Sequence, residues 1–294
     1  MRTSILCVLF VLLTVVGHSS HAQELPTPAY IYGIKNDGDL LWYRNADFFS
    51  GLERWDGPKK VGVGWQNFKQ VFSGGGSIIY AIQNDGTLLW YDHKGFSEGN
   101  GIDVAGAWEG PKKVGVGWQN FKQVFSGGNS VIYAIQDDGT LLWYRHNGFS
   151  KGDGLDVEGA WEGPKKVGIG WQNFKQVFSG GSNIIYAIQD DGTLLWYRHN
   201  GFSKGDGIDV AGAWEGPKKV GKGWQNFKQV FSMGYGVIYA IQNDGALLWY
   251  RHNGFSSGDG LDVGGAWQGP KQVGNGWQHF KDVFGLFRSA NYLR

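Results

Sequence analysis

Apolar and polar positions alternate in short runs along the chain, and turn residues separate these runs. In one representative stretch they predict four strands, at Phe121–Phe125, Val131–Gln136, Thr140–His146 and roughly Gly163–Val167. Asp137-Asp138-Gly139 separates the second run from the third, and Asp-Gly between β-branched and aromatic residues is a strong hairpin signal. In the second run both alternating sets of positions are apolar, which predicts a strand that is covered on both faces.

This pattern recurs along the chain at a fixed spacing that the tryptophans mark. Five copies of Gly-Trp-Gln-(Asn/His)-Phe-Lys place tryptophans 53 residues apart, at Trp65, Trp118, Trp171, Trp224 and Trp277. A second and a third tryptophan series keep this spacing, except that Trp42 precedes Trp90 by only 48 residues. The first copy has therefore lost five residues between Trp42 and Trp55. Self-similarity at such a period indicates a solenoid or a propeller.

The two ends of the chain decide between these architectures. A solenoid needs atypical capping repeats at its ends. Here the first copy begins at its second strand, Ala29–Ile34, and the chain finishes with a lone first strand, Phe280–Phe284. Each end supplies what the other lacks. We therefore expect an all-β protein, a five-bladed β-propeller of four-stranded antiparallel blades closed by a composite blade from both termini.

The start of the chain predicts export. Residues 1–22 have the features of a secretory signal peptide, with Arg2 before an apolar run at Ile5–Val16 and a small-residue cleavage site at Ser20-His21-Ala22. The apolar run is too short for a membrane span, and no later segment qualifies. We expect a secreted protein, extracellular or periplasmic, with a short leader at residues 23–29 and the propeller at residues 30–294.

Charge and cysteine content exclude several classes of function. The chain has 27 basic and 26 acidic residues and a formal net charge of +1, so it lacks the cationic field of a general nucleic-acid binder. The paired lysines at Lys59, Lys112, Lys165 and Lys218 are spread one pair per copy and are interpreted as solvated strand ends. Cys7 lies in the signal segment, so the mature chain has no disulfide or thiolate chemistry.

The longest irregular segment of each copy, between the third and fourth strands, has the composition of a sugar site. A pyranose offers an apolar face to an aromatic ring and hydroxyl groups to carboxylates, amides and main-chain groups. Asn147–Trp161 combines these elements, and it recurs at Lys94–Trp108, Asn200–Trp214 and Asn253–Trp267. The predicted carbohydrate-binding residues are His93, Phe96, Asn100, Asp103, Trp108, His146, Asn147, Phe149, Asp153, Asp156, Trp161, His199, Asn200, Phe202, Asp206, Asp209, Trp214, His252, Asn253, Phe255, Asp259, Asp262 and Trp267.

Structural roles compete for some of these residues. The tryptophans of the third strands, such as Trp143, are expected to pack between blades, and packing is an equal alternative for the loop tryptophans. A loop hydrogen bond is the favoured role for each histidine, and single histidines on separate blades predict no metal site. Gly152-Asp153-Gly154-Leu155-Asp156 resembles part of a calcium nonapeptide. That motif works by immediate tandem stacking, so we expect no bound cofactor.

The repeat resembles a known family. Each full copy reads (Ile/Val)-Ile-Tyr-Ala-Ile-Gln-(Asn/Asp)-Asp-Gly-(Thr/Ala)-Leu-Leu-Trp-Tyr, and most continue with Lys-Lys-Val-Gly-x-Gly-Trp-Gln-Asn-Phe-Lys-Gln-Val-Phe. These motifs are similar to the repeats of the tachylectins, secreted five-bladed propeller lectins, over Tyr30–Phe287. The resemblance implies non-catalytic binding of N-acetylated hexosamines, GlcNAc or GalNAc, at one shallow site per blade near the loops between neighbouring blades.

The chain departs from the best-known member of that family in the loop. That member has Asp-Asn directly before the loop tryptophan, where this chain has Gly159-Ala160. The loop here is also longer, so carboxylates for a sugar must come from Asp153 or Asp156. The first copy, Asn45–Trp55, lacks the Gly-Asp-Gly-x-Asp run. We therefore expect four full sites and one that is weakened or absent.

The leading hypothesis is a secreted, monomeric, multivalent lectin whose partners are glycans that carry GlcNAc or GalNAc. An enzyme is disfavoured, because catalysis needs one asymmetric constellation of groups and the copies are nearly identical. A non-catalytic protein–protein interaction propeller is the alternative that the sequence leaves open.

Overall fold

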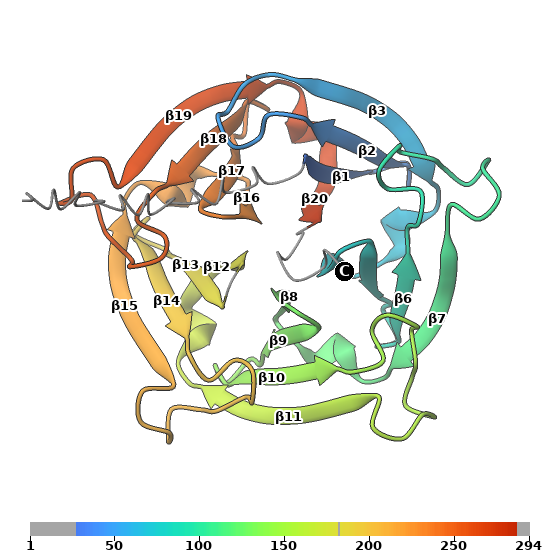
Figure 1. The fold of residues 1–294 in the computed structure, drawn as a ribbon, viewed down its shortest axis with the longest axis horizontal. Coiled ribbons are helices and arrows are strands. Elements are labelled where there is room, and N and C mark those ends of the chain that lie inside the picture. The colour runs from blue at the N-terminus through green and yellow to red at the C-terminus, as the bar shows by residue number, and fades with distance from the viewer. Residues whose placement is uncertain (1–27, 182, 287–294) are drawn as a thin grey trace, which may run out of the picture.

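Five four-stranded antiparallel sheets stand around a central axis in the computed structural model, which describes residues 28–181 and 183–286 (Figure 1). This is the predicted five-bladed β-propeller. The proposed signal segment at residues 1–22, including Cys7, lies outside the described residues. No helix within the described ranges is long and apolar enough to cross a membrane.

The strands of each blade follow one another from the axis outward. The first blade is composite and consists of β20 (Phe280–Leu286), β1 (Ala29–Lys35), β2 (Leu40–Asn45) and β3 (Trp55–Gly62). The second consists of β4 (Gln70–Gly75), β5 (Ile78–Ile82), β6 (Leu88–Asp92) and β7 (Glu109–Gly115). The third consists of β8 (Gln123–Gly128), β9 (Val131–Ile135), β10 (Leu141–His146) and β11 (Trp161–Gly168).

The last two blades repeat this order. The fourth consists of β12 (Phe174–Gly181), β13 (Ile184–Gln189), β14 (Leu194–His199) and β15 (Trp214–Gly221). The fifth consists of β16 (Gln229–Gly234), β17 (Val237–Ile241), β18 (Leu247–His252) and β19 (Trp267–Gly274). Short 3₁₀ turns connect the blades, at η1 (Trp65–Asn67), η2 (Trp118–Asn120), η3 (Trp171–Asn173), η4 (Trp224–Asn226) and η5 (Trp277–His279).

The predicted ring closure is confirmed. β20 pairs antiparallel with β1, with Tyr32 opposite Phe284 and Tyr30 opposite Leu286. Figure 1 shows β20, from the end of the chain, beside β1 from its beginning. Without β20, the inner edge of β1 would have unpaired backbone groups, and closure of the ring avoids this hazard.

The predicted strands are confirmed with small shifts at their ends. β8 begins at Gln123 and not at Phe121, because Phe121 is the residue that ends the 3₁₀ turn η2. β11 begins at Trp161, earlier than predicted, because Trp161 pairs with His146 at the end of β10. The fourth strand therefore starts where the irregular loop re-enters the sheet.

The hydrophobic core lies between the blades. Trp90 of β6 and Tyr80 of β5 are fully buried and belong to one cluster with Val124 and Ile132 of the third blade. Equivalent clusters fill the other four junctions. The expectation that the third-strand tryptophans pack between blades is therefore confirmed.

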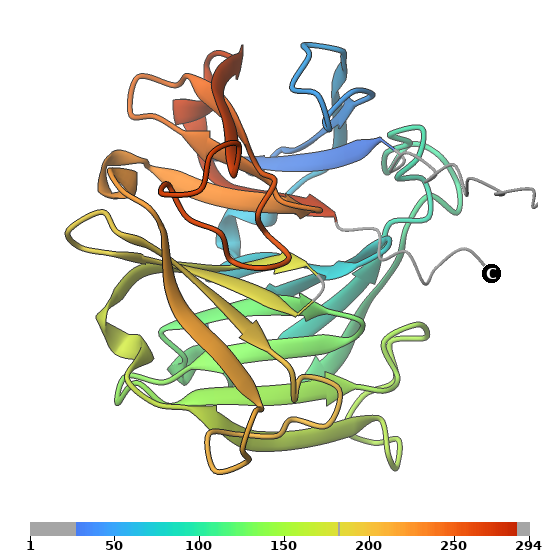
Figure 2. The same ribbon diagram turned by 60° about the vertical axis from the view of Figure 1, so that its left-hand side comes forward.

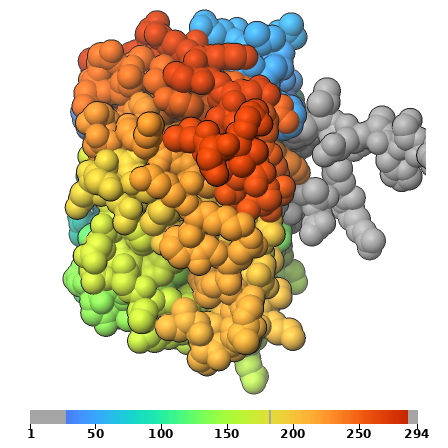
Figure 3. All heavy atoms as spheres, turned by 90° about the vertical axis from the view of Figure 1, so that its left-hand side faces the viewer, coloured from blue at the N-terminus to red at the C-terminus, as the bar shows by residue number. Residues whose placement is uncertain are grey.

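The two faces of the ring carry different connections. On the face that we call the loop face lie the long segments between third and fourth strands; on the opposite turn face lie the Asp-Gly hairpins and the 3₁₀ turns. Figures 2 and 3 show the long segments standing out from the rim of the ring. The candidate sugar-binding residues are thus gathered on one side of the molecule.

Candidate functional site

Each long segment on the loop face has two parts. The first part, which we call the strap, lies against the preceding blade, and in the third blade it is residues 147–154. The second part, the tip, is residues 155–159 and is exposed throughout. The corresponding straps are residues 94–101, 200–207 and 253–260, and the tips are residues 102–106, 208–212 and 261–265.

Two side chains of the preceding blade hold the strap. The indole Nε1 of Trp90 donates a hydrogen bond to the Phe149 carbonyl at 2.6 Å, and Lys112 Nζ donates to the Lys151 carbonyl at 2.6 Å. Lys112 also lies over the Trp90 ring, 4.9 Å from its centroid, where the cation is attracted by the aromatic face. The first lysine of each lysine pair therefore anchors the next blade's strap while its side chain stays partly exposed, so its interpretation as a solvated strand end was incomplete.

A glycine in each strap permits this close approach. Gly152 has φ +66°, and a Cβ atom at this position would lie 2.6 Å from the Trp90 ring. Gly99, Gly205 and Gly258 occupy the same place on the third-strand tryptophans of their preceding blades. Both the left-handed backbone and the missing side chain are needed for the strap to lie flat on the tryptophan.

The histidines lie beneath the straps and hold them to the sheet. His146 is fully buried, its Nδ1 is 2.6 Å from the Tyr80 hydroxyl, and its Nε2 is 2.7 Å from the Asp153 carbonyl. A carbonyl only accepts, so Nε2 carries the proton and Nδ1 accepts from Tyr80. Burial lowers the pKa of the ring, which stays neutral at pH 7.

The histidines must therefore be removed from the list of direct sugar contacts. All four are fully buried, and both ring nitrogens of each are occupied, at His93, His146, His199 and His252. A ligand on the surface cannot reach them in this structure. The loop hydrogen bond that the sequence favoured is present in each of these four blades.

The loop tryptophans have a mixed role. Trp161 stacks on His146 with 4.2 Å between ring centroids and 6° between planes, and its Nε1 donates to the Val114 carbonyl of the preceding blade at 2.9 Å. The ring is half-buried. One face and the N–H group are therefore committed to packing, and only the remaining surface of the ring is open to a ligand. Trp108, Trp214 and Trp267 repeat this arrangement.

The phenylalanines and asparagines belong to the strap. Phe96 is half-buried and meets Tyr30 of the preceding blade edge to face at 5.0 Å; Phe149, Phe202 and Phe255 are half-buried at the same position. Asn147 is exposed, and its Nδ2 donates to the Gly159 carbonyl at 3.0 Å, which closes the segment. Asn200 and Asn253 do the same.

The carboxylates fall into two groups. The first group is half-buried and consists of Asp153, Asp206 and Asp259, whose backbone carbonyls accept hydrogen bonds from the histidines. Asn100 has this role in the second blade. The tip carboxylates, Asp103, Asp156, Asp209 and Asp262, are exposed and make no salt bridge within residues 28–181 and 183–286. The tip carboxylates are therefore the ones that are available to a ligand.

Apolar residues at the tips are a further feature that the sequence pattern did not lead us to expect in a site. Leu155 and Val157 flank Asp156 and are 62% and 43% exposed. The same exposed pair occurs as Ile102 and Val104, Ile208 and Val210, and Leu261 and Val263. The signal was the recurring apolar-Asp-Val triplet inside an otherwise polar loop. Each tip thus presents two aliphatic groups around one carboxylate.

The first blade has a strap but no tip. Its short segment keeps the strap: Trp249 Nε1 donates to the Phe48 carbonyl at 2.6 Å, and Lys271 Nζ donates to the Ser50 carbonyl at 2.7 Å. Asn45, fully buried in the place of the histidine, lies 3.4 Å from the Tyr239 hydroxyl. The five lost residues fall in the tip, so the blade junction forms without it.

The described part of the chain has no group of three or more His, Cys, Asp or Glu residues that is placed to hold a metal ion. The loops offer aliphatic and aromatic surface, exposed carboxylates and main-chain groups. This is the mixture that a shallow sugar site requires.

Comparison with known proteins agrees with this architecture. A family model described as Tachylectin matches residues 149–286. This match and the five-bladed ring confirm the resemblance to the tachylectin family. No curated protein matches the chain.

One solved structure supports the fold, and only the fold, and two others have weaker similarity. One structure, from work on the de novo evolutionary emergence of a symmetrical protein, has a TM-score of 0.55 and 18% identity, and the match covers 89% of this chain and 100% of that one. AofleA from Arthrobotrys oligospora matches with a TM-score of 0.38 and 14% identity, over 84% of this chain and 71% of its own. Prp20p from Saccharomyces cerevisiae matches with a TM-score of 0.39 and 15% identity, over 84% of this chain and 61% of its own.

Proposed function

We propose that this chain is a secreted, multivalent carbohydrate-binding protein that recognises N-acetylated hexosamines, GlcNAc or GalNAc, on glycans. The tachylectin match and the propeller fold support a lectin-like, non-enzymatic protein. The sugar itself, secretion and a monomeric state are further parts of the proposal.

The observation that carries the proposal is the separation of strap from tip. The first blade forms its junction without a tip, so the four remaining tips are not needed to build the ring. They nevertheless carry exposed aliphatic pairs around an exposed carboxylate. Exposed apolar groups in repeated loops on a rigid scaffold are typical of binding surfaces.

A sugar at one tip is expected to bind weakly. It buries little area on an open loop, so we expect millimolar to high-micromolar affinity per site, about 4 to 6 kcal/mol. Four equivalent tips on one face convert this into useful avidity on a clustered glycan, because the later binding events are intramolecular. The proposal thus explains why the same loop is displayed four times.

The test uses the first blade as a template. Replacing residues 147–160 with the sequence of residues 46–54 gives the third blade a short loop that retains the strap, and the same exchange is possible in the other three blades. We expect binding to immobilised GlcNAc or GalNAc to fall stepwise from one to four exchanges, while the melting temperature changes little. Asp137→Asn, on the turn face, is the matched control and leaves binding unchanged.

Two results would overturn the proposal. One is full binding to GlcNAc surfaces by a folded variant with all four short loops. The other is no binding of the unaltered protein to any N-acetylated glycan at high surface density. The exposed aliphatic pairs also suit a protein partner. Capture of one protein through the tips, insensitive to free GlcNAc and GalNAc, would support the interaction-propeller alternative.

A further inference from the structure

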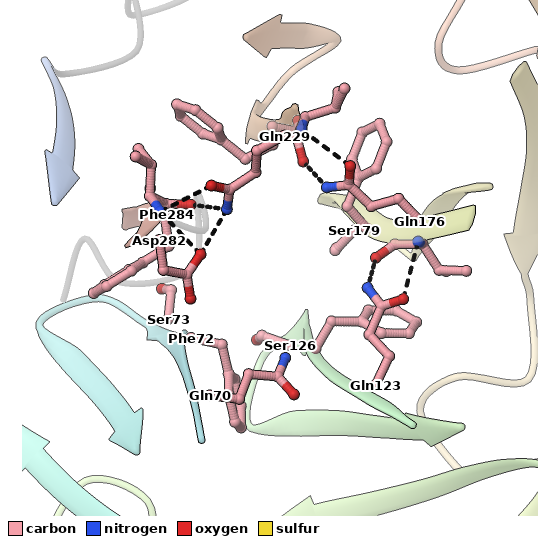
Figure 4. Close-up of a pocket in the computed structure, with 18 of the residues that line it drawn as sticks. Gln70, Phe72, Ser73, Gln123, Ser126, Gln176, Ser179, Gln229, Asp282 and Phe284 are labelled. Carbon is pink, nitrogen blue, oxygen red and sulfur yellow. Dashed lines mark hydrogen bonds between the residues drawn. The ribbon is translucent and has the colours of Figure 1, made fainter. Parts of the chain in front are cut away.

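A ring of five lysines surrounds the central channel on the turn face. Each lysine is exposed and directly precedes a channel-lining residue; we call Lys69, Lys122, Lys175, Lys228 and Lys281 the lysine collar. The channel holds about 120 Å³ and is lined by the glutamines that follow the collar, with Asp282 in the fifth position (Figure 4). The collar is on the opposite face from the sugar-binding tips.

Hydrogen bonds to the neighbouring blade hold each ammonium group in place. Lys228 Nζ donates to the carbonyls of Gln278 and Phe280 at 2.6 and 2.7 Å. Lys281 Nζ donates to the equivalent carbonyls of Gln66 and Phe68. The other three lysines contact the next 3₁₀ turn in the same way. An ammonium group has three N–H donors, so each collar lysine keeps at least one for a ligand.

The collar faces one carboxylate, Asp282, among the described residues that line the channel. No collar lysine makes a salt bridge within residues 28–181 and 183–286. Hydrogen bonds from Thr87 lower the pKa of the hairpin carboxyl of Asp85, and the charge of Lys113, a lysine outside the collar, lowers it further. Five like charges around a channel of low dielectric focus a positive field at its mouth.

A cavity of about 280 Å³ opens between three of these lysines. Lys175, Lys228 and Lys281 line it, together with the aromatic ring of Phe227. Asp282 is the one carboxylate in the lining. Its Oδ1 accepts from Gln229 Nε2 at 2.7 Å and from the Val283 N–H at 2.9 Å, so neutral donors already occupy this oxygen.

We propose that the lysine collar is a second ligand site, separate from the loop tips, and that it binds clustered oxyanions of the phosphate or sulfate type. Three exposed lysines line one cavity, and their spare donors can form charge-assisted hydrogen bonds to such a group. The collar lies on the axis, so it takes one ligand per ring. A purely structural role, in which the lysines only cap the 3₁₀ turns, predicts a loss of stability on substitution and no ligand.

Inorganic tripolyphosphate is the probe, titrated calorimetrically into the unaltered full chain at low salt. We expect saturable one-to-one binding that weakens as salt rises. In the triple variant Lys175→Gln/Lys228→Gln/Lys281→Gln the affinity falls at least about tenfold, which is 1.4 kcal/mol. Glutamine removes the charge and keeps a polar N–H group at each exposed position, so we expect the variant to keep the fold; its melting temperature verifies this.

The matched control is Lys113→Gln/Lys166→Gln/Lys219→Gln, which removes the same charge from the same face outside the collar. We expect its affinity for tripolyphosphate to change less than about twofold. Asp282→Asn removes the opposing carboxylate and strengthens binding. No saturable binding by the unaltered protein, or equal losses in the two triple variants, overturns the proposal.

Two competition experiments identify the source of the oxyanion. Displacement of tripolyphosphate by a sulfated oligosaccharide indicates an acidic glycan as the ligand; displacement by phosphate compounds alone indicates a free phosphate. The collar variant should bind GlcNAc surfaces normally. Failure of the collar site is therefore distinguishable from failure of the proposed lectin function.

Discussion

Gln229 and Asp282 join the fifth blade to the first through a hydrogen bond of 2.7 Å from Gln229 Nε2 to Asp282 Oδ1 (Figure 4). At four blade junctions a glutamine clamps a valine of the next inner strand: Gln176 Oε1 accepts from the Val230 N–H at 3.1 Å and its Nε2 donates to the Val230 carbonyl. Asp282 stands where the fifth glutamine would be. A carboxylate only accepts, so the junction with Val71 lacks the donating half of the clamp.

Asp282→Asn is expected to stabilise the ring at neutral pH. Burial raises the pKa of Asp282 to about 6 from its ordinary value of 3.8, so the folded protein holds this proton more tightly than the unfolded chain. The stability gained by protonation is full below pH 3.8 and is lost as pH rises through 6. At pH 7.5 we expect the free energy of unfolding to rise by about 1 to 3 kcal/mol in the variant, because the amide is neutral and can also donate.

Urea unfolding of both proteins at pH 4 and pH 7.5 provides the measurement. The difference in unfolding free energy between the variant and the unaltered protein isolates the effect of Asp282, because all other side chains are the same in both. We expect the difference to be near zero at pH 4. A difference that does not change with pH would show that Asp282 is not held with a raised pKa.

The buried histidines make the protein less stable as the pH falls, which is opposite to the effect of Asp282. Burial lowers the pKa of His93 to about 4 and that of His146, His199 and His252 in the same direction. The unfolded chain therefore binds these protons more readily. Their contribution to stability is full above pH 6.5 and is lost as pH falls toward 4.

We expect the unaltered protein to lose at least several kcal/mol of unfolding free energy between pH 7 and pH 4.5, because each unit of pKa shift is about 1.4 kcal/mol per group. Urea unfolding measures this loss, and the NMR chemical shifts of the imidazole protons report the protonation state of each ring. The four buried rings should stay neutral at pH 6. Titration of all rings near pH 6.5 would contradict the buried geometry.

The fold could be predicted from the sequence because its signals are local and repeated. Asp137-Asp138-Gly139 marks a hairpin without reference to any other residue, and the incomplete first and last copies reveal the closure that pairs β1 with β20. Strand ends were less accurate. Phe121 has the side chain of a strand residue, but its position directly after η2 decides its conformation.

The site could be predicted only in part, because contacts between blades decide which loop residues are free. His146 was a candidate ligand contact with a loop hydrogen bond as its favoured role, but its second partner, Tyr80, is 66 residues away and could not be foreseen. Lys112 looked solvated, yet it reaches the Lys151 carbonyl of the next blade. The aliphatic pair Leu155 and Val157 was visible in the sequence, but its exposure follows from the strap that lifts the tip away from the sheet.

Gly152→Ala is expected to loosen the strap. Gly152 has φ +66°, and the new Cβ atom would lie 2.6 Å from the buried Trp90 ring. We expect a loss of about 3 kcal/mol or more in unfolding free energy, from the left-handed backbone and the overlap together. Gly159→Ala is the matched control, with φ +74° and nothing within 4 Å of a new Cβ atom. It should cost only about 1 to 2 kcal/mol. Equal losses in thermal or urea unfolding would show that overlap with Trp90 does not matter.

Truncation of the chain before Phe280 is expected to prevent folding. β20 contributes four buried apolar side chains, Phe280, Val283, Phe284 and Leu286, and pairs with β1 along its length. Burial of such a side chain contributes about 1.5 to 3 kcal/mol, so their joint loss approaches the whole stability of a typical domain, about 5 to 15 kcal/mol. The exposed edge of β1 would also invite aggregation.

Circular dichroism and size-exclusion chromatography measure the outcome, and a chain that ends at Leu286 is the control because it keeps β20 complete. Addition of a peptide with the sequence of residues 280–286 to the truncated chain tests the cause. If the loss arises from the open ring, the peptide restores a monomeric fold with a transition that depends on peptide concentration. A truncated chain that melts cooperatively at the temperature of the control would show that the ring does not need closure by β20, and the remaining blades would then have to hold together through their clamped junctions alone.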